Sequence, residues 1–281
     1  MGIIAALIST VICTVLYIRM YKREVPEPIG KLKAAFPVLL GVIAVIISTV
    51  MVMLIGLLLI KIRGVFSSVT DTPLVIQSLV RSFFLAGFTE ELAKLLMFLL
   101  VIRVCKPRNV YEYGMLCAGI GFGFTALEDV IYGGVNPVSS VFRVFFFAMH
   151  MMFGLLMGLH LGLARYKRKE GSGDARKHTF LAFLLPVLWH TVFDASTTTN
   201  AAFSSDDDIT QIVGLVIALV VLAVSITLQI VLLIRFKKKT EELCRMCFAE
   251  KEGQQSSAEK AEQQDSAEKA EQKSLAEKAE Q

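Results

Sequence analysis

The residues most able to do chemistry in this sequence are ionisable side chains inside long apolar stretches. A charge at the centre of a bilayer costs roughly 2.5 kcal/mol or more, so such residues usually face the protein interior and serve a function. Carboxylates and imidazoles together can act as general bases and can hold a water molecule or a divalent metal, as hydrolysis requires. The candidate catalytic residues are Glu90, Glu91, Glu128, His150, His190 and Asp194.

The stretch Gly87–Lys94 places three charges at the head of an apolar run. Glu90 and Lys94 are spaced i, i+4 and share one helical face, whereas Glu91 lies about 100° around the helix from Glu90. A Glu–Lys pair lowers the penalty of burying one carboxylate. The second carboxylate needs a partner from another part of the chain.

The remaining candidates lie on three further apolar runs. Glu128 follows Phe124 at i+4, His150 lies alone, and Asp194 follows His190 at i+4. Each one has an ordinary structural explanation when taken singly, such as an orienting hydrogen bond or an interfacial position. Taken together at one depth, they favour a functional centre.

The same residue types suit a metal. Zinc accepts His nitrogen and Glu oxygen, and three protein ligands leave a place for water. A glutamate peptidase without a metal would use the same groups, so the sequence leaves both mechanisms open. The candidate zinc ligands are Glu91, Glu128, His150 and His190.

The cysteines offer no competing chemistry. Cys117 is expected at the opposite depth of the bilayer, so no Cys–His nucleophile is indicated. Cys244 and Cys247 have CxxC spacing, but no second pair follows, and a structural zinc site wants four ligands. We expect two juxtamembrane thiols there.

Composition and charge indicate the elements that must position these residues. The chain has 281 residues, of which 54% are hydrophobic, and several apolar runs reach the roughly 20 residues that a helix needs to cross a membrane. The net charge of +4 does not indicate a nucleic-acid partner, because the basic residues lie at the ends of the apolar runs, where they set orientation. We expect an all-α, polytopic transmembrane bundle.

About seven spans and one partial helix are expected. The segment 74–86 contains Arg81 and is too short and polar for a comfortable span, so it is predicted to be amphipathic and to lead into the third span. Basic clusters follow spans one, three, five and seven, which places the N-terminus outside and the C-terminus in the cytoplasm. The predicted spans are 3–18, 36–60, 87–103, 113–132, 141–163, 180–195 and 209–234.

Alternating helix directions would bring the candidates to one depth. The third and fifth spans begin at the outer face, and the fourth and sixth end there. At 1.5 Å per residue, the four key positions fall roughly 5–14 Å below the outer boundary. These positions are Glu90, Glu128, His150 and His190.

The C-terminal region differs in composition from the rest. Residues 1–239 are predicted to form the membrane domain, with its motif core at 82–196. Residues 240–281 are rich in Glu, Lys, Gln and Ala and contain the hexapeptide Ala-Glu-Lys-Ala-Glu-Gln three times. This segment has too little apolar surface for a core, so we expect a charged cytoplasmic tail, disordered or helical, without chemistry.

Four motifs, in their order along the chain, resemble those of the PrsW family of intramembrane proteases. They are Glu90-Glu91-x-x-Lys94, Phe124-x-x-x-Glu128, His150 with a downstream Gly, and His190-x-x-x-Asp194. That family shares a superfamily with the CAAX prenyl endopeptidases, which show His where this chain has Glu128, and with the bacteriocin-processing CPBP proteins. Asp129 stands where many PrsW members have Asn.

The resemblance implies an activity and a partner. It implies site-1 cleavage, near the outer face of the membrane, of a single-span anti-sigma factor in Gram-positive bacteria. Removal of the outer part of that substrate would permit a second cut and release a sigma factor.

The resemblance also implies roles for individual residues. Glu90 and Glu128 would activate the attacking water, and His190 with Asp194 would stabilise the oxyanion. His150 would be a further ligand or hydrogen-bond donor. Supporting roles would fall to Phe124 and to Lys94, the latter holding Glu91 or Glu90 in place.

The alternative is a proton- or cation-coupled transporter, because buried carboxylates and imidazoles also serve proton relays. Transporters commonly show inverted repeats and helices broken at the midplane. The spans show no internal repeat, and the ionisable groups are confined to one half of the bilayer. We therefore favour the peptidase.

Overall fold

The computed structural model describes residues 2–61, 74–135, 148–197 and 208–248. The chain divides into two compact units, Met1–Cys247 and Phe248–Gln281, and the described helices lie in the first. The repeat-containing tail, expected to be disordered or helical, lies outside the described residues from residue 249 onward. The division expected at residue 239 stays a prediction.

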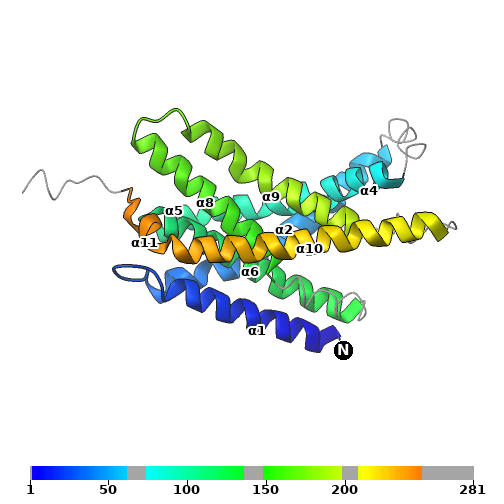
Figure 1. Ribbon diagram of the computed structural model, residues 1–281, viewed down its shortest axis with the longest axis horizontal. Helices are drawn as coiled ribbons and strands as arrows, with labels where there is room; N and C mark the ends of the chain where they lie inside the picture. Colours follow the sequence, from blue (N-terminus) through cyan, green and yellow to red (C-terminus); the bar gives the residue numbers. More distant parts are fainter. Residues whose placement is uncertain (1, 62–73, 136–147, 198–207, 249–281) are drawn as a thin grey trace, which may run out of the picture. The chain divides into compact units, whose positions relative to one another are not determined.

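The described chain is almost entirely helical (Figure 1), which confirms the all-α class. A π-helical turn, η1, joins two of the helices and is included below. The elements are α1 (Gly2–Tyr21), α2 (Lys31–Lys61), α4 (Leu74–Ser82), η1 (Phe83–Gly87), α5 (Phe88–Cys105), α6 (Val110–Val135), α8 (Met149–Lys169), α9 (Ala175–Thr197), α10 (Asp208–Lys238) and α11 (Thr240–Arg245).

Five of these helices are long and apolar enough to cross a membrane, namely α1, α2, α6, α9 and α10. The chain is therefore a multi-span membrane protein. Helices α5 and α8 correspond to the third and fifth predicted spans and fall outside this group. Helix α5 has four charged residues within its 18, and α8 ends in a basic run. The number of seven spans stays a prediction.

Helix α6 lies at the centre of the bundle and contacts α1, α2 and α8. Glycines allow α8 to cross it closely. A Cβ atom at Gly121 would lie 2.0 Å from the carbonyl oxygen of His150, and one at Gly158 would lie 2.3 Å from that of Tyr113. The backbone that carries His150 is therefore held directly against α6.

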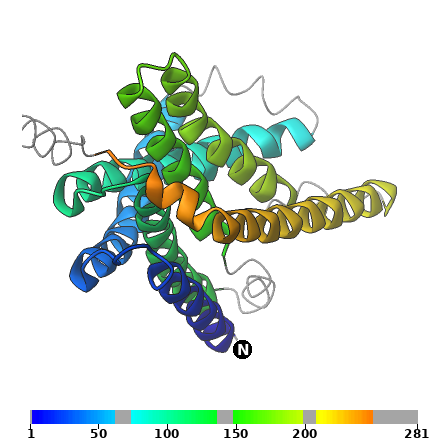
Figure 2. The same cartoon turned by 60° about the vertical axis from the view of Figure 1, so that its left-hand side comes forward.

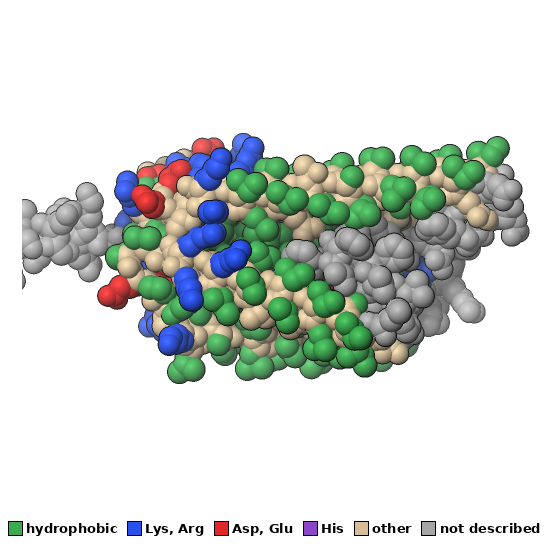
Figure 3. All heavy atoms as spheres, turned by 60° about the horizontal axis from the view of Figure 1, so that its bottom comes forward, with side chains coloured by type: hydrophobic (Ala, Val, Ile, Leu, Met, Phe, Trp, Pro, Cys, Tyr) green, Lys and Arg blue, Asp and Glu red, His purple; other side chains and the backbone are tan. Residues whose placement is uncertain are grey.

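Helices α8 and α9 form a hairpin and lie side by side in both views (Figures 1 and 2). The last turn of α8 is basic, as is that of α10. Lys and Arg side chains gather at this end of the helices (Figure 3). His150 is the second residue of α8, so the positive charge lies at the opposite end of that helix from the histidine.

The segment 74–86, predicted to be amphipathic, continues into α5 through uninterrupted helical turns. Helix α4 packs on α9, and η1 connects it to α5. Single π turns occur mostly as insertions in α-helices and frequently at functional sites. Gly87, at the end of η1, faces α9, where an added Cβ would lie 2.2 Å from Thr191 Oγ1 and 2.9 Å from the carbonyl oxygen of Val187. This close approach brings the head of α5 against the part of α9 that carries His190.

Candidate active site

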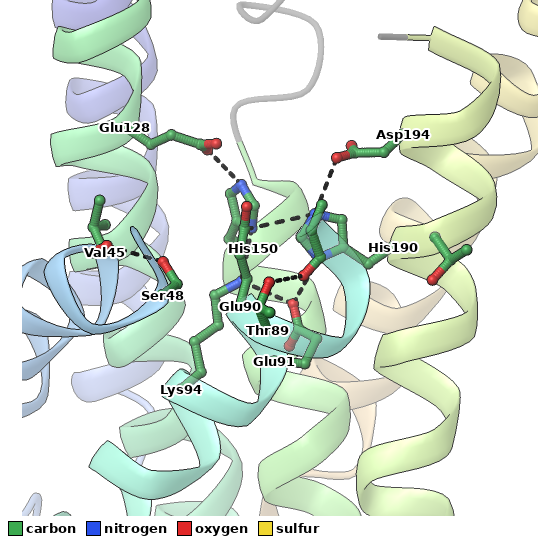
Figure 4. Close-up of polar contacts among 12 residues, drawn as sticks. Val45, Ser48, Thr89, Glu90, Glu91, Lys94, Glu128, His150, His190 and Asp194 are labelled. Carbon is green, nitrogen blue, oxygen red and sulfur yellow. Dashed lines mark hydrogen bonds and ion pairs between the residues drawn. The ribbon is translucent and has the colours of Figure 1, made fainter. Parts of the chain in front are cut away.

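The structure brings the candidate residues of four helices together in one cluster (Figure 4). Their side chains point toward one another from the head of α5, the end of α6, the start of α8 and the second half of α9. The residues are Glu90, Glu91 and Lys94 on α5, Glu128 on α6, His150 on α8, and His190 and Asp194 on α9.

Glu91 holds His190. The Glu91 side chain is fully buried, and its Oε1 lies 2.8 Å from Lys94 Nζ and 2.9 Å from His190 Nδ1. An ionised carboxylate only accepts hydrogen bonds, so His190 donates from Nδ1, and in the neutral ring the lone pair is then at Nε2. Glu91 thereby fixes both the orientation of the His190 ring and which nitrogen is free.

Lys94 holds His150 in the same way from the opposite side. Its Nζ is fully buried and lies 2.8 Å from His150 Nδ1. An ammonium only donates, so Nδ1 accepts and Nε2 carries the proton, which it donates to Glu128 Oε2 at 2.7 Å. The sequence suggests that Lys94 holds Glu91 or Glu90, and ion pairs to both are present, at 2.8 and 3.8 Å. Its bond to His150 has no counterpart in the sequence pattern, because the two residues lie on different helices.

Glu90 presents an unsatisfied oxygen to both imidazoles. Among the residues that the structure describes, its buried Oε2 has no hydrogen-bond partner. This atom lies 3.8 Å from His150 Nδ1 and 3.7 Å from His190 Nε2. Asp194 Oδ2 is also 3.7 Å from His190 Nε2. Buried polar atoms without partners are rare and costly, so this oxygen indicates a place for a water molecule or an ion.

The donor set fits a divalent cation. One ligand atom each from Glu90, His150 and His190 lies within 4.8 Å of the others. Zinc binds such atoms at about 2.0–2.2 Å, so tetrahedral ligands lie about 3.3 Å apart. The two separations from Glu90 Oε2 to the histidine nitrogens, 3.8 and 3.7 Å, need to close by about half an ångström. The geometry groups Glu90 with the two histidines, whereas the sequence suggests Glu91 and Glu128. These last two carboxylates instead contact the outer nitrogens of the imidazoles, as supporting carboxylates do in metal sites.

Aromatic rings enclose the histidines. The Phe153 ring stacks on His190 with centroids 4.8 Å apart, and the Phe124 ring is 4.8 Å from that of His150. Lys94 Nζ lies 4.0 Å above the Phe124 ring, which is a cation–π contact. The sequence points to Phe124 but not to Phe153, although its i+3 spacing from His150 on one helix face would indicate it. Apolar rings around a polar cluster lower the local dielectric, which strengthens its hydrogen bonds and ion pairs.

Other polar residues contact partners away from this cluster. Ser9 donates to Asp129 Oδ2 at 2.6 Å and so ties α1 to α6. His160 Nδ1 contacts His178 Nδ1 at 3.0 Å, between the halves of α8 and α9 that lie toward the basic end of α8. Cys244 and Cys247 carry free thiols, and Cys247 donates to the carbonyl of Cys244.

Comparisons with known proteins find one family and several relatives. Residues 28–226 match the model described as PrsW family intramembrane metalloprotease. The chain is 30% identical over 118 residues to "Protease PrsW" of Oceanobacillus iheyensis, a match that covers 41% of this chain and 53% of that protein. It is 27% identical to the protein of the same name from Halalkalibacterium halodurans (42% and 54% covered) and 28% identical to that from Clostridioides difficile (40% and 50% covered).

The chain spans about half the length of the curated relatives that it matches. No solved structure is significantly similar to it. The family match, however, extends over more than half of the chain and contains all four motifs that converge at the cluster. The chain therefore belongs to the PrsW family of intramembrane metalloproteases.

Proposed function

We propose that this protein is an intramembrane endopeptidase that hydrolyses a peptide bond of a single-span membrane protein. The observation that carries the proposal is the buried Oε2 of Glu90, which has no hydrogen-bond partner among the described residues and faces two oriented imidazoles inside a membrane bundle. Membership of the PrsW family and the similarity to proteins named "Protease PrsW" support it. By resemblance to that family, the substrate is an anti-sigma factor and the reaction is site-1 cleavage.

Glu90 and His190 would hold a divalent cation, together with His150 when its Nδ1 is free. Zinc is the candidate, because it accepts this mixture of oxygen and nitrogen ligands. When bound, such an ion polarises the scissile carbonyl as a Lewis acid. Glu91 and Glu128 fix the rings of His190 and His150, so the two imidazoles are preorganised before substrate arrives.

Proton transfer would begin at the carboxylates. Glu90 is the first candidate to take the proton of the attacking water, because its Oε2 is free, and Glu128 is the second. In the alternative glutamate mechanism without a metal, the lone pair of His190 Nε2 is not occupied by a cation, and this nitrogen, which lies near Glu90 and Asp194, can receive this proton. The resulting N–H would stabilise the oxyanion and then protonate the leaving amine, while Asp194 stabilises the charged ring.

The proposed orientation follows the positive-inside rule. The basic ends of α8 and α10 would lie in the cytoplasm, with the N-terminus outside and the C-terminal tail inside. The histidine cluster would then lie in the outer half of the bilayer. Cleavage near the outer face of the membrane is the expected consequence.

Cleavage by purified protein tests the proposal. The full chain in detergent would be mixed with candidate single-span substrates, including anti-sigma factors, and the products would be identified by mass spectrometry. We expect Glu90→Gln, Glu91→Gln and His190→Ala each to abolish cleavage. Glu242→Gln, at an exposed side chain of α11, is the matched control and should cleave normally. Undiminished cleavage by all three site variants would refute the assignment.

A further inference from the structure

The lone pair of His150 Nδ1 can bind either of two cations, the ammonium of Lys94 or a divalent metal ion. In the structure it accepts a hydrogen bond from Lys94 Nζ at 2.8 Å. The same atom faces Glu90 Oε2 at 3.8 Å, and His150 belongs to the group of possible metal ligands. An unprotonated imidazole nitrogen has one lone pair in the ring plane, which can accept a hydrogen bond or bind a metal, but not both.

The ammonium of Lys94 is well fixed in its place. It is fully buried, pairs with Glu91 at 2.8 Å, lies 3.8 Å from Glu90 and rests over the Phe124 ring. These contacts stabilise a positive charge next to the candidate metal position. A divalent ion that enters there would meet both an occupied nitrogen and a like charge.

The other imidazole differs in this respect. His190 Nδ1 is bound by Glu91, and its Nε2 faces Glu90 and Asp194, which are both carboxylates. A cation is attracted to this nitrogen and meets no competing donor among its described contacts. The two histidines are therefore unequal as ligands.

We propose that Lys94 is a positioning residue that competes with the divalent cation for His150. While Lys94 is docked, the cation is held by Glu90 and His190, and His150 becomes a ligand only when the ammonium withdraws. This inference rests on the proposed metal-dependent function. Lys94 would then lower the affinity of the site for the cation, in addition to forming its ion pair with Glu91.

Metal binding by the full chain in detergent tests the inference independently of cleavage. Cobalt(II) is the probe, because its visible spectrum reports its ligands, and its affinity can be measured by competition with a chromophoric chelator. We expect Lys94→Met to bind cobalt about 10-fold tighter or more, in the range by which groups around metal ligands alter affinity. Lys238→Met removes an exposed positive charge at the far end of α10 and should bind as the wild type does.

The same substitution made in a His150→Gln chain distinguishes competition for His150 Nδ1 from the simple removal of a positive charge. In a His150→Gln chain, Lys94→Met should change cobalt affinity by less than about 2-fold, since the contested nitrogen is gone. A gain that persists in this background would overturn the proposal, as would equal or weaker binding by Lys94→Met alone. Cobalt binding by none of these chains would also overturn it.

A count of the coordinated imidazoles tests the inference independently of the affinities. Pulsed electron paramagnetic resonance of bound copper(II) counts the coordinated imidazoles. We expect one, with a signal that persists in His150→Gln. Two imidazoles in the wild type, one of them lost in His150→Gln, would contradict the inference. If these binding results hold but no substrate is cleaved, the peptidase proposal alone fails.

Discussion

Gly87→Ala should uncouple the two helices that carry Glu91 and His190. An added Cβ would lie 2.2 Å from Thr191 Oγ1 and 2.9 Å from the carbonyl oxygen of Val187. Ordinary contact begins at 3.4 Å, so the gap must open by about 1.2 Å at the hydroxyl and about 0.5 Å at the carbonyl. Rotation of Thr191 can relieve the first contact, but the second is backbone, and α9 must move.

Such a shift would stretch the hydrogen bond between Glu91 and His190, which is 2.9 Å long. A displacement of about 0.5–1.2 Å along this bond lengthens it to about 3.4–4.1 Å, beyond the usual range of about 2.7–3.2 Å. Hydrogen bonds to charged groups contribute about 1.5–3 kcal/mol, which corresponds to a rate loss of about 10- to 150-fold. Alanine is also a better helix former than glycine, so helix content should be unchanged.

The assay is the initial cleavage rate in detergent, with circular dichroism as the check on folding. Gly56→Ala is the matched control, because nothing lies within 4 Å of the added Cβ in α2, and its rate should equal that of the wild type. Adding Thr191→Ala to Gly87→Ala removes the larger clash and should restore part of the rate. If Gly87→Ala were as active as Gly56→Ala, close packing of α5 on α9 would not be what positions His190.

Two further predictions concern stability. Burial, together with the neighbouring carboxyl of Glu112, raises the pKa of Glu24, in the loop before α2, from 4.5 to about 8. The contribution of Glu24 to stability is therefore full below about pH 4.5 and is lost as the pH rises through about 8. The thermal midpoint of the wild type in detergent should fall between pH 6 and 9, and that of Glu24→Gln should fall less. An equal fall in both proteins would contradict this prediction. Ser9→Ala removes the 2.6 Å hydrogen bond to buried Asp129 and should lower the free energy of unfolding by about 1–3 kcal/mol in denaturant titrations, and an unchanged midpoint would show that the bond does not tie α1 to α6.

Much of the site could be predicted from rare charges in apolar runs. The polar residues had to face protein rather than lipid, and alternating helix directions placed Glu90, Glu128, His150 and His190 in one half of the bundle. The structure shows these residues in contact (Figure 4). The spacing of His190 and Asp194 likewise predicted the shared helix face on which they lie, with 3.7 Å between them.

The sequence does not show which of Glu90 and Glu91 orients His190 and which is the candidate metal ligand. The two differ only by a rotation of about 100° around α5, and the close approach of Gly87 to α9 sets which of them hydrogen-bonds to His190. The bond between Lys94 and His150 depends in turn on how α8 crosses α6, which the sequence leaves open. The π turn η1 is a local change of backbone hydrogen bonding that leaves the apolar pattern intact.

The central claim is that buried carboxylates and imidazoles from four helices form one metal-assisted hydrolytic centre. It is tested most directly by metal content and cleavage rate measured on the same purified sample, before chelation, after chelation and after zinc is restored. We expect cleavage to vanish with the metal and to return with it, and Glu90→Gln to bind zinc more weakly and to stay inactive throughout. A metal-free wild type that cleaves its substrate at the untreated rate would contradict the account.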